Sequence, residues 1–107
     1  MSIPAESLSH PAVRAFVTAL NANDRAAFRE ALGPSAAMSD DGSDRDIGQW
    51  TEKEVFSAHG HMDVQSESAD GLSLVATFHN ETWGEMRTRW QFTVQEGKVL
   101  RFDTGQA

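Results

Sequence analysis

The sequence predicts a single α+β domain in which N-terminal helices pack on one face of a curved antiparallel sheet. Three observations support this fold class. Apolar residues recur at helical spacing in the first third of the 107-residue chain, they alternate with polar residues from about residue 61 onward, and turn-forming pairs separate the alternating segments. A chain of this length is typical of one compact domain. We therefore expect one domain over residues 1–107.

Two helices are predicted in the N-terminal part. The apolar residues that share one face of the first helix are spaced three or four positions apart: Val13, Phe16, Val17 and Leu20. Pro11 suits the first turn of this helix, where its missing N–H is not needed. The second helix is expected from about Asp24 to Leu32, and Gly33-Pro34 should end it because proline cannot continue a helix.

The middle of the chain should contain a short strand, a polar loop and a third helix. The strand is expected over 36–39 and the loop over 40–46, where four acidic residues occur together with glycine and serine. Thr51 and Glu54 have the spacing of a capping box, so the third helix is expected to begin at Thr51. Gly60 should end it.

From residue 61 onward the spacing changes to a period of two, which indicates strands. Four strands are expected, over 61–69, 72–79, 85–95 and 98–103. Their connections at Asp70-Gly71, 80–84 and Glu96-Gly97 carry turn residues, so the strands should form an antiparallel meander. In the third of these strands, one set of alternating residues is mainly apolar and should face inward: Met86, Thr88, Trp90, Phe92 and Val94.

The composition excludes several classes of function. The 16 acidic and 9 basic residues give a net charge of −7, whereas nucleic-acid binding needs clustered lysine and arginine. The chain contains no cysteine, which excludes disulfides and thiolate sites, and no tyrosine, which removes the phenol as a donor. No apolar run approaches the roughly 20 residues of a membrane span. We expect a cytoplasmic protein that binds neither nucleic acid nor a membrane.

Two stretches resemble a known superfamily. The first runs from Phe16 to Asp24, and ketosteroid isomerases have a similar stretch that ends in Leu-Asn-Ala-Gly-Asp. The second is Trp90–Val94 followed by Gly97-Lys98-Val99, which is similar to the family's final aromatic hairpin. With the order of the elements, these stretches resemble the nuclear transport factor 2-like superfamily, which includes ketosteroid isomerases and SnoaL-like polyketide cyclases. The resemblance implies a cone-shaped α+β barrel with an apolar pocket at its open end, and a homodimer.

The resemblance also implies a candidate catalytic residue. An ungapped count places Asp40 where the isomerases have their general base, and a carboxylate at the mouth of an apolar pocket can move a proton beside a carbonyl. The alternative is that Asp40 is one of the acids that solvate the loop. The two oxyanion donors of the isomerases are missing, because Phe16 stands at the position of a tyrosine and Trp90 or Thr88 at that of an acid. Steroid isomerase activity is therefore not expected.

The remaining candidate site residues are a histidine and a set of mainly aromatic side chains. His59 is a candidate second proton carrier because its helix should lie next to the Asp40 loop; a surface role is the alternative. The pocket is expected to be lined by Phe16, Trp50, Phe56, Phe78, Trp83, Met86, Thr88 and Trp90. No metal site is expected, since the acidic loop departs from EF-hand spacing and the histidines lack a third ligand. No cofactor is expected.

Alternating arginines raise one more comparison. Limonene epoxide hydrolases of the same superfamily use an Asp-Arg-Asp set to activate water. Here Asp103 is offset by one residue from that pattern, which should turn it to the opposite face of the sheet. Arg87, Arg89 and Arg101 occupy alternating strand positions opposite Trp90 and Phe92, so they should lie on the outer face, either as cross-strand partners of Asp and Glu residues or as dimer-interface contacts.

Two function hypotheses follow. In the first, the domain binds a small, largely apolar organic molecule and carries out cofactor-free proton transfer such as isomerisation, cyclisation or dehydration, with Asp40 as the base. In the second, it is a non-catalytic ligand-binding or dimerisation module. Fold class alone does not separate the two hypotheses, because one fold hosts many functions.

Overall fold

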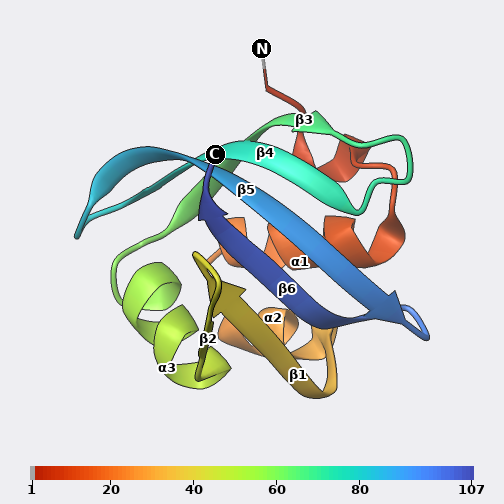
Figure 1. Ribbon diagram of the computed structural model, residues 1–107, viewed down its shortest axis with the longest axis horizontal. Helices are drawn as coiled ribbons and strands as arrows, with labels where there is room; N and C mark the ends of the chain where they lie inside the picture. Colours follow the sequence, from red (N-terminus) through yellow and green to blue (C-terminus); the bar gives the residue numbers. More distant parts are fainter. Residues whose placement is uncertain (1) are drawn as a thin grey trace.

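The computed structural model describes residues 2–107, which form one six-stranded sheet with helices on one of its faces (Figure 1). The helical elements are η1 (Ala5–Ser7), α1 (Pro11–Asn21), α2 (Arg25–Ala31), α3 (Ile47–Thr51) and the π-helical turn η2 (Glu52–Phe56). The strands are β1 (Leu32–Asp40), β2 (Ser43–Arg45), β3 (His61–Glu67), β4 (Ser73–Asn80), β5 (Gly84–Gln95) and β6 (Lys98–Gln106). The predicted α+β class is confirmed.

The sheet has the strand order β2-β1-β6-β5-β4-β3. The predicted meander of β3 to β6 is confirmed, with antiparallel pairing throughout. One pairing was not anticipated: β1 runs parallel to β6, so that Asp40 lies beside Thr104. This pairing also explains why β1 is longer than the predicted strand over 36–39, because β6 pairs with Leu32 and, after a register shift, with Ala37 to Asp40.

The two N-terminal helices form as predicted and cover the sheet. The side chain of His10 accepts the N–H of Ala12 and caps α1, and Asp24 caps α2 in the same way by accepting the N–H of Ala27. The ring of Phe16, at the centre of the buried stripe of α1, lies with its centroid 4.9 Å from that of Phe92. This stripe seals one face of the sheet. No helix among residues 2–107 has both the length and the apolar character needed to cross a membrane.

The predicted start of the third helix is wrong. The helix α3 begins at Ile47, because Asp46 takes the N-cap position and accepts the N–H of Gln49 at 2.9 Å. Thr51 lies inside the helix, where its hydroxyl donates to the Ile47 carbonyl at 2.7 Å. A hydroxyl bonded to the preceding turn cannot act as the cap of the next one. The earlier start brings Trp50 onto a helix instead of leaving it in a loop.

The polar loop predicted over 40–46 is a tight hairpin. Asp41 and Gly42 both have positive φ, 49° and 85°, and Asp40 pairs with Ser43 across the turn. Two central residues with positive φ define the two-residue turn that best suits a twisted hairpin. The short strand β2 therefore returns along β1 and brings Arg45 beside Met38.

Candidate functional site

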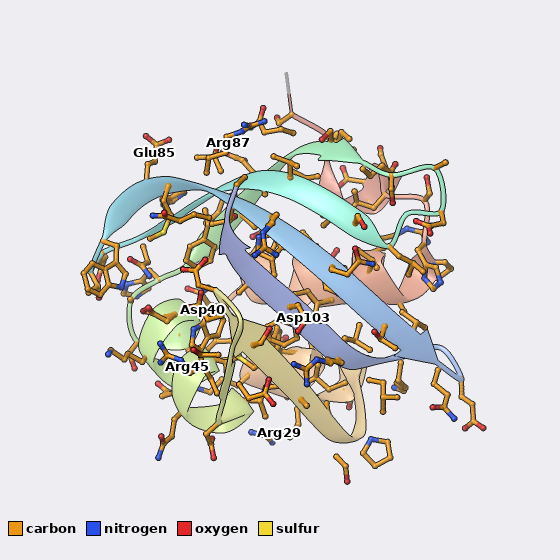
Figure 2. All side chains as sticks on the ribbon, in the orientation of Figure 1. Arg29, Asp40, Arg45, Glu85, Arg87 and Asp103 are labelled. Atoms are coloured by element: carbon orange, nitrogen blue, oxygen red, sulfur yellow. The ribbon has the colours of Figure 1, made fainter. Side chains whose placement is uncertain are left out.

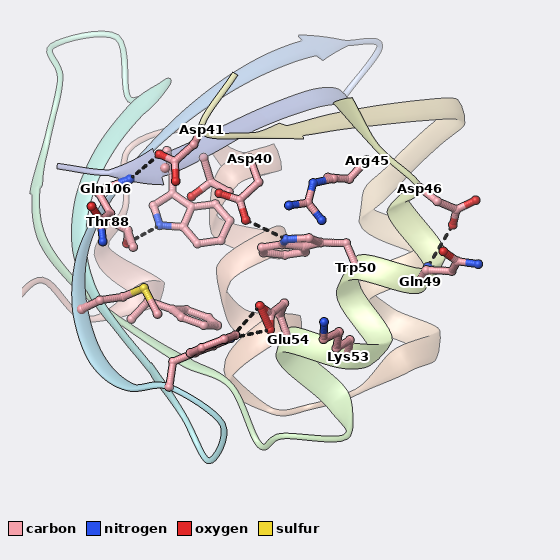
Figure 3. Close-up of a pocket in the computed structure, with 16 residues that line it drawn as sticks. Asp40, Asp41, Arg45, Asp46, Gln49, Trp50, Lys53, Glu54, Thr88 and Gln106 are labelled. Carbon is pink, nitrogen blue, oxygen red and sulfur yellow. Dashed lines mark hydrogen bonds between the residues drawn. The ribbon is translucent and has the colours of Figure 1, made fainter. Parts of the chain in front are cut away.

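A pocket of about 590 Å³ opens at one end of the sheet, between the β1–β2 hairpin, α3 with η2, and the strands β4 to β6 (Figure 3). Aromatic rings form much of its wall: Trp50, Phe78, Trp83 and Trp90. Charged side chains surround its mouth: Asp40, Asp41, Arg45, Asp46, Lys53 and Glu54. Met86, Thr88 and Thr104 complete the strand side of the wall.

Asp40 is held in this pocket by a tryptophan. As the last residue of β1 it is half-buried, and its Oδ2 accepts the indole N–H of Trp50 at 3.0 Å. Trp50 is itself fixed, because it is buried and its ring packs edge-on against that of Trp90 at a centroid separation of 6.3 Å. Among residues 2–107 this is the one side-chain hydrogen bond of Asp40, so Oδ1 remains available.

The other two tryptophans of the pocket also donate their indole N–H groups within the protein. Trp83 is 59% exposed at the mouth and donates to both oxygens of Glu54, at 3.0 and 3.1 Å. Trp90 is buried and donates to the Thr88 hydroxyl at 2.8 Å, which in turn donates to the Ala76 carbonyl. These bonds fix which ring surfaces face the pocket.

The structure brings together most of the predicted site. Seven of the predicted residues line one pocket: Asp40, Trp50, Phe78, Trp83, Met86, Thr88 and Trp90. They come from four elements and one turn, and the curvature of the sheet closes them around a shared space. Because alternate residues of a strand point to one face, Phe78, Met86, Thr88 and Trp90 reach the same side of the sheet.

Three predicted site residues lie outside this pocket. Phe16 is fully buried between α1 and the sheet, so it belongs to the core. Phe56 lines a separate cavity of about 240 Å³, where the Arg25 guanidinium lies 5.2 Å from the centre of its ring. His59 has positive φ and its exposed side chain pairs with Glu81 at 2.9 Å, which directs it to solvent. These positions correct the expected roles of the three residues.

Of the charged residues at the mouth of the pocket, only Asp40 is among the predicted site residues. Asp41, Arg45 and Asp46 reach it because the β1–β2 hairpin folds back beside α3. The signal for this hairpin was Asp41-Gly42, a dipeptide that favours a two-residue turn. Residues 2–107 contain no group of three or more His, Asp or Glu side chains arranged to hold a metal ion.

The outer face of the sheet carries a separate ionic network. Arg101 donates to Asp103 at 3.0 Å and to Asp44 at 2.7 Å, and these carboxylates raise the pKa of its guanidinium. Asp103 also accepts the hydroxyl of Ser39. Figure 2 shows Asp103 on the face of β6 away from the helices α1 and α2. The prediction that Arg101 and Asp103 face outward is therefore confirmed, and neither lines the pocket.

No protein-family model matches the sequence, and no curated protein is detectably similar to it in sequence. Solved structures share its fold. A candidate polyketide cyclase from Sinorhizobium meliloti superposes with a TM-score of 0.78 at 19% identity, covering 95% of this chain and 99% of that one. An NTF2-like protein of unknown function from Cytophaga hutchinsonii gives 0.70 at 12% identity, covering 100% and 93%.

A candidate ketosteroid isomerase from Kribbella flavida gives a TM-score of 0.70 at 14% identity, covering 90% of this chain and 75% of that one. The helices on one face of a curved sheet, with a pocket at one end of that sheet, define a class of small α+β folds. Within that class, the chain has the nuclear transport factor 2-like fold, as the resemblance of its sequence implied. Identities at this level establish the fold alone.

Proposed function

We propose that this domain binds one small, largely apolar organic molecule in the pocket, with the polar group of the ligand against Asp40. The observation that carries the proposal is the pocket itself. Its volume of about 590 Å³ falls within the roughly 300–1,000 Å³ of small-molecule sites, and it combines aromatic walls with a half-buried carboxylate. The likeness of the fold to those of a candidate polyketide cyclase and a candidate ketosteroid isomerase supports a small organic ligand.

The proposal is tested by filling the pocket. Met86 lines it, so Met86→Trp should occupy the space and abolish binding of lipophilic probes measured by calorimetry or thermal shift. Arg87→Trp is the matched control, because it places the same side chain at the next residue of β5, which is exposed on the outer face. Equal loss of binding in both variants, or unchanged binding in Met86→Trp, would contradict the proposal.

A second candidate function is cofactor-free proton transfer with Asp40 as the base. It is favoured by the free Oδ1 of Asp40, which stands at a pocket wall of aromatic side chains. The test is turnover of carbonyl compounds that first prove to bind. Asp40→Asn keeps the size of the side chain and an acceptor for Trp50, yet removes the base, so turnover should be lost while the fold persists. Retained turnover would remove Asp40 from the mechanism.

We also propose that the domain is a homodimer. This proposal is supported by its resemblance to a superfamily in which homodimers are common, and by a sheet whose outer face is free of helices among residues 2–107 (Figure 1). Light scattering after size-exclusion chromatography tests it directly. A mass of one 11.7 kDa chain at micromolar concentration would refute it.

A further inference from the structure

We infer that the ligand of this pocket carries a protonated amine, held between Asp40 and the aromatic wall. This inference rests on the proposed function, because it assigns the chemical class of the molecule that the pocket is proposed to bind. It is carried by three features of the pocket: the use of its hydrogen-bond donors, the charges around its mouth, and the ring faces that it presents.

The neutral side-chain donors of the wall are already used inside the protein. The indole N–H groups of Trp50 and Trp90 are donated to Asp40 and Thr88, and the N–H of Trp83 is donated to Glu54. The hydroxyl of Thr88 donates to Ala76, and that of Thr104 donates to the carbonyl of Arg89 at 3.0 Å. Every hydroxyl and indole of the wall thus has an acceptor before a ligand enters.

This pattern disfavours ligands that need donors. A carbonyl, carboxylate or phosphate group buried against the wall would find no side-chain N–H or O–H to replace its lost water, which is costly. The donors that remain belong to exposed side chains at the mouth: Arg45, Gln49, Lys53 and Gln106. A ligand with hydrogen-bond donors of its own is favoured instead, because the Oδ1 of Asp40 can accept a hydrogen bond from it.

The charges at the mouth favour a cation. Four carboxylates line the pocket against two basic side chains, which gives the lining a formal charge of −2: Asp40, Asp41, Asp46 and Glu54 against Arg45 and Lys53. None of these six forms an ion pair within residues 2–107. The acids accept neutral N–H groups instead, so their charges are not cancelled by a protein cation in contact with them.

The aromatic wall suits the same ligand. Ammonium groups are attracted to the faces of indole and phenyl rings, most strongly when they are shielded from water. Trp50 donates its in-plane N–H to Asp40, so this carboxylate lies at the edge of the indole, and a cation at the Oδ1 of Asp40 contacts the carboxylate and not the face of that ring (Figure 3). Trp83, which is 59% exposed at the mouth, is the ring with an accessible face for the ligand, whereas Trp90 and Phe78, with ring centroids 6.0 Å apart, are almost fully buried at the base of the pocket.

Arg45 is the basic residue that would compete with such a ligand. It lies opposite Met38 in the β1–β2 hairpin, on the side of the mouth where Figure 3 shows Asp40. It is exposed and forms no ion pair with any residue from 2 to 107, so it can move away from an entering cation. Arg45→Gln should therefore strengthen binding of an amine and weaken binding of a carboxylate.

Three probes with one aromatic body and different head groups test the inference: 2-naphthylmethylamine, 2-naphthylmethanol and 2-naphthoate. At neutral pH, titration calorimetry on the whole chain should show the amine binding about tenfold more tightly than the alcohol, with the carboxylate weakest. Asp40→Asn should lower the affinity for the amine about tenfold and change that for the alcohol by no more than about twofold. Asp63→Asn, the control, removes the same charge from an exposed site on β3 and should leave both affinities unchanged.

The outcomes separate the inference from the proposed function. Binding of the alcohol or the carboxylate as tightly as the amine overturns the inference while the pocket remains a ligand site. Failure of all three probes to bind overturns the proposed function and the inference with it. The ranking of the three probes is measured on the unmodified protein, so it tests the preference for an amine even if Asp40→Asn fails to fold.

Discussion

Replacing Phe16 by tyrosine tests whether this position lies in the core, as the structure shows, or faces the pocket, as the family resemblance implies. The resemblance aligns Phe16 with a catalytic tyrosine, whereas the structure buries its ring completely. Four aromatic residues surround it: the rings of Phe28, Phe92 and Phe102 at 4.9 Å and that of Trp90 at 6.2 Å, centroid to centroid. A hydroxyl added among these rings loses water and gains no acceptor from them.

The size of the effect follows from that environment. An unsatisfied buried hydroxyl costs about 1–3 kcal/mol. For a domain of about 100 residues, each kcal/mol lowers the melting temperature by roughly 4–8 °C, so Phe16→Tyr should melt at least about 4 °C below the wild type. Differential scanning calorimetry measures this directly. Phe56→Tyr is the matched control: Phe56 is also buried, but it lines a cavity beside the exposed polar side chains of Arg25 and Glu52, so its melting point should fall by less than that of Phe16→Tyr.

A Phe16→Tyr variant as stable as the wild type would contradict the burial of Phe16 in the core. The same burial would be contradicted if that variant gained affinity for a carbonyl probe such as 2-acetylnaphthalene. Either result would mean that the new hydroxyl reaches the pocket, as the family alignment implies, and that the ring of Phe16 is not sealed within the core.

Three further predictions address the elements around the pocket. Asp46→Ala removes the cap of α3 and should lower the free energy of unfolding by about 1 kcal/mol in urea denaturation; an unchanged midpoint would contradict the assigned helix start. Gly105→Ala brings a Cβ within 2.5 Å of the Asp41 carboxylate, so it should destabilise the protein and broaden or shift the backbone NMR signals of the hairpin turn. The hydrogen bond from Arg25 lowers the pKa of Glu52 from 4.5 to about 2. The Arg25–Glu52 ion pair is exposed and screened by salt, so its contribution to stability is small; it is complete above pH 4.5 and is lost as the pH falls towards 2. In Arg25→Gln, the NMR titration midpoint of Glu52 should return towards 4.5.

Much of the fold could be predicted from local patterns. The stripe of α1 and the alternation in β4 and β5 are repeated signals, and Glu96-Gly97 closes its hairpin by local turn chemistry alone. The start of α3 was missed because two capping signals compete within six residues. Asp46 wins, since its side chain reaches Gln49 while the hydroxyl of Thr51 is bonded to the turn before it.

The candidate site could be predicted only in part, because the patterns that indicate helices and strands do not reveal cavities. Alternation shows that Phe78 and Trp90 face inward, but it does not distinguish a side chain that lines a cavity from one that fills the core. Phe16 has as clear an apolar pattern as Trp90, and it lies in the core. The direction of His59 depends on a single positive φ, which no periodicity encodes. The acids at the mouth depend on the β1–β2 hairpin, a tertiary arrangement signalled by one dipeptide.

The parallel pairing of β1 with β6 has a consequence for how the pocket forms during synthesis. Asp40 is aligned with Thr104, and the N–H of Gln106 is donated to Asp41, so the acidic side of the mouth depends on residues made more than 60 positions later. Pairings this distant in sequence are slow to close. While the ribosome is still producing β5, β1 and β2 have no strand to join, and their edge is open to chaperones or to other chains. The pocket is therefore a late product of folding, completed by the last strand to emerge.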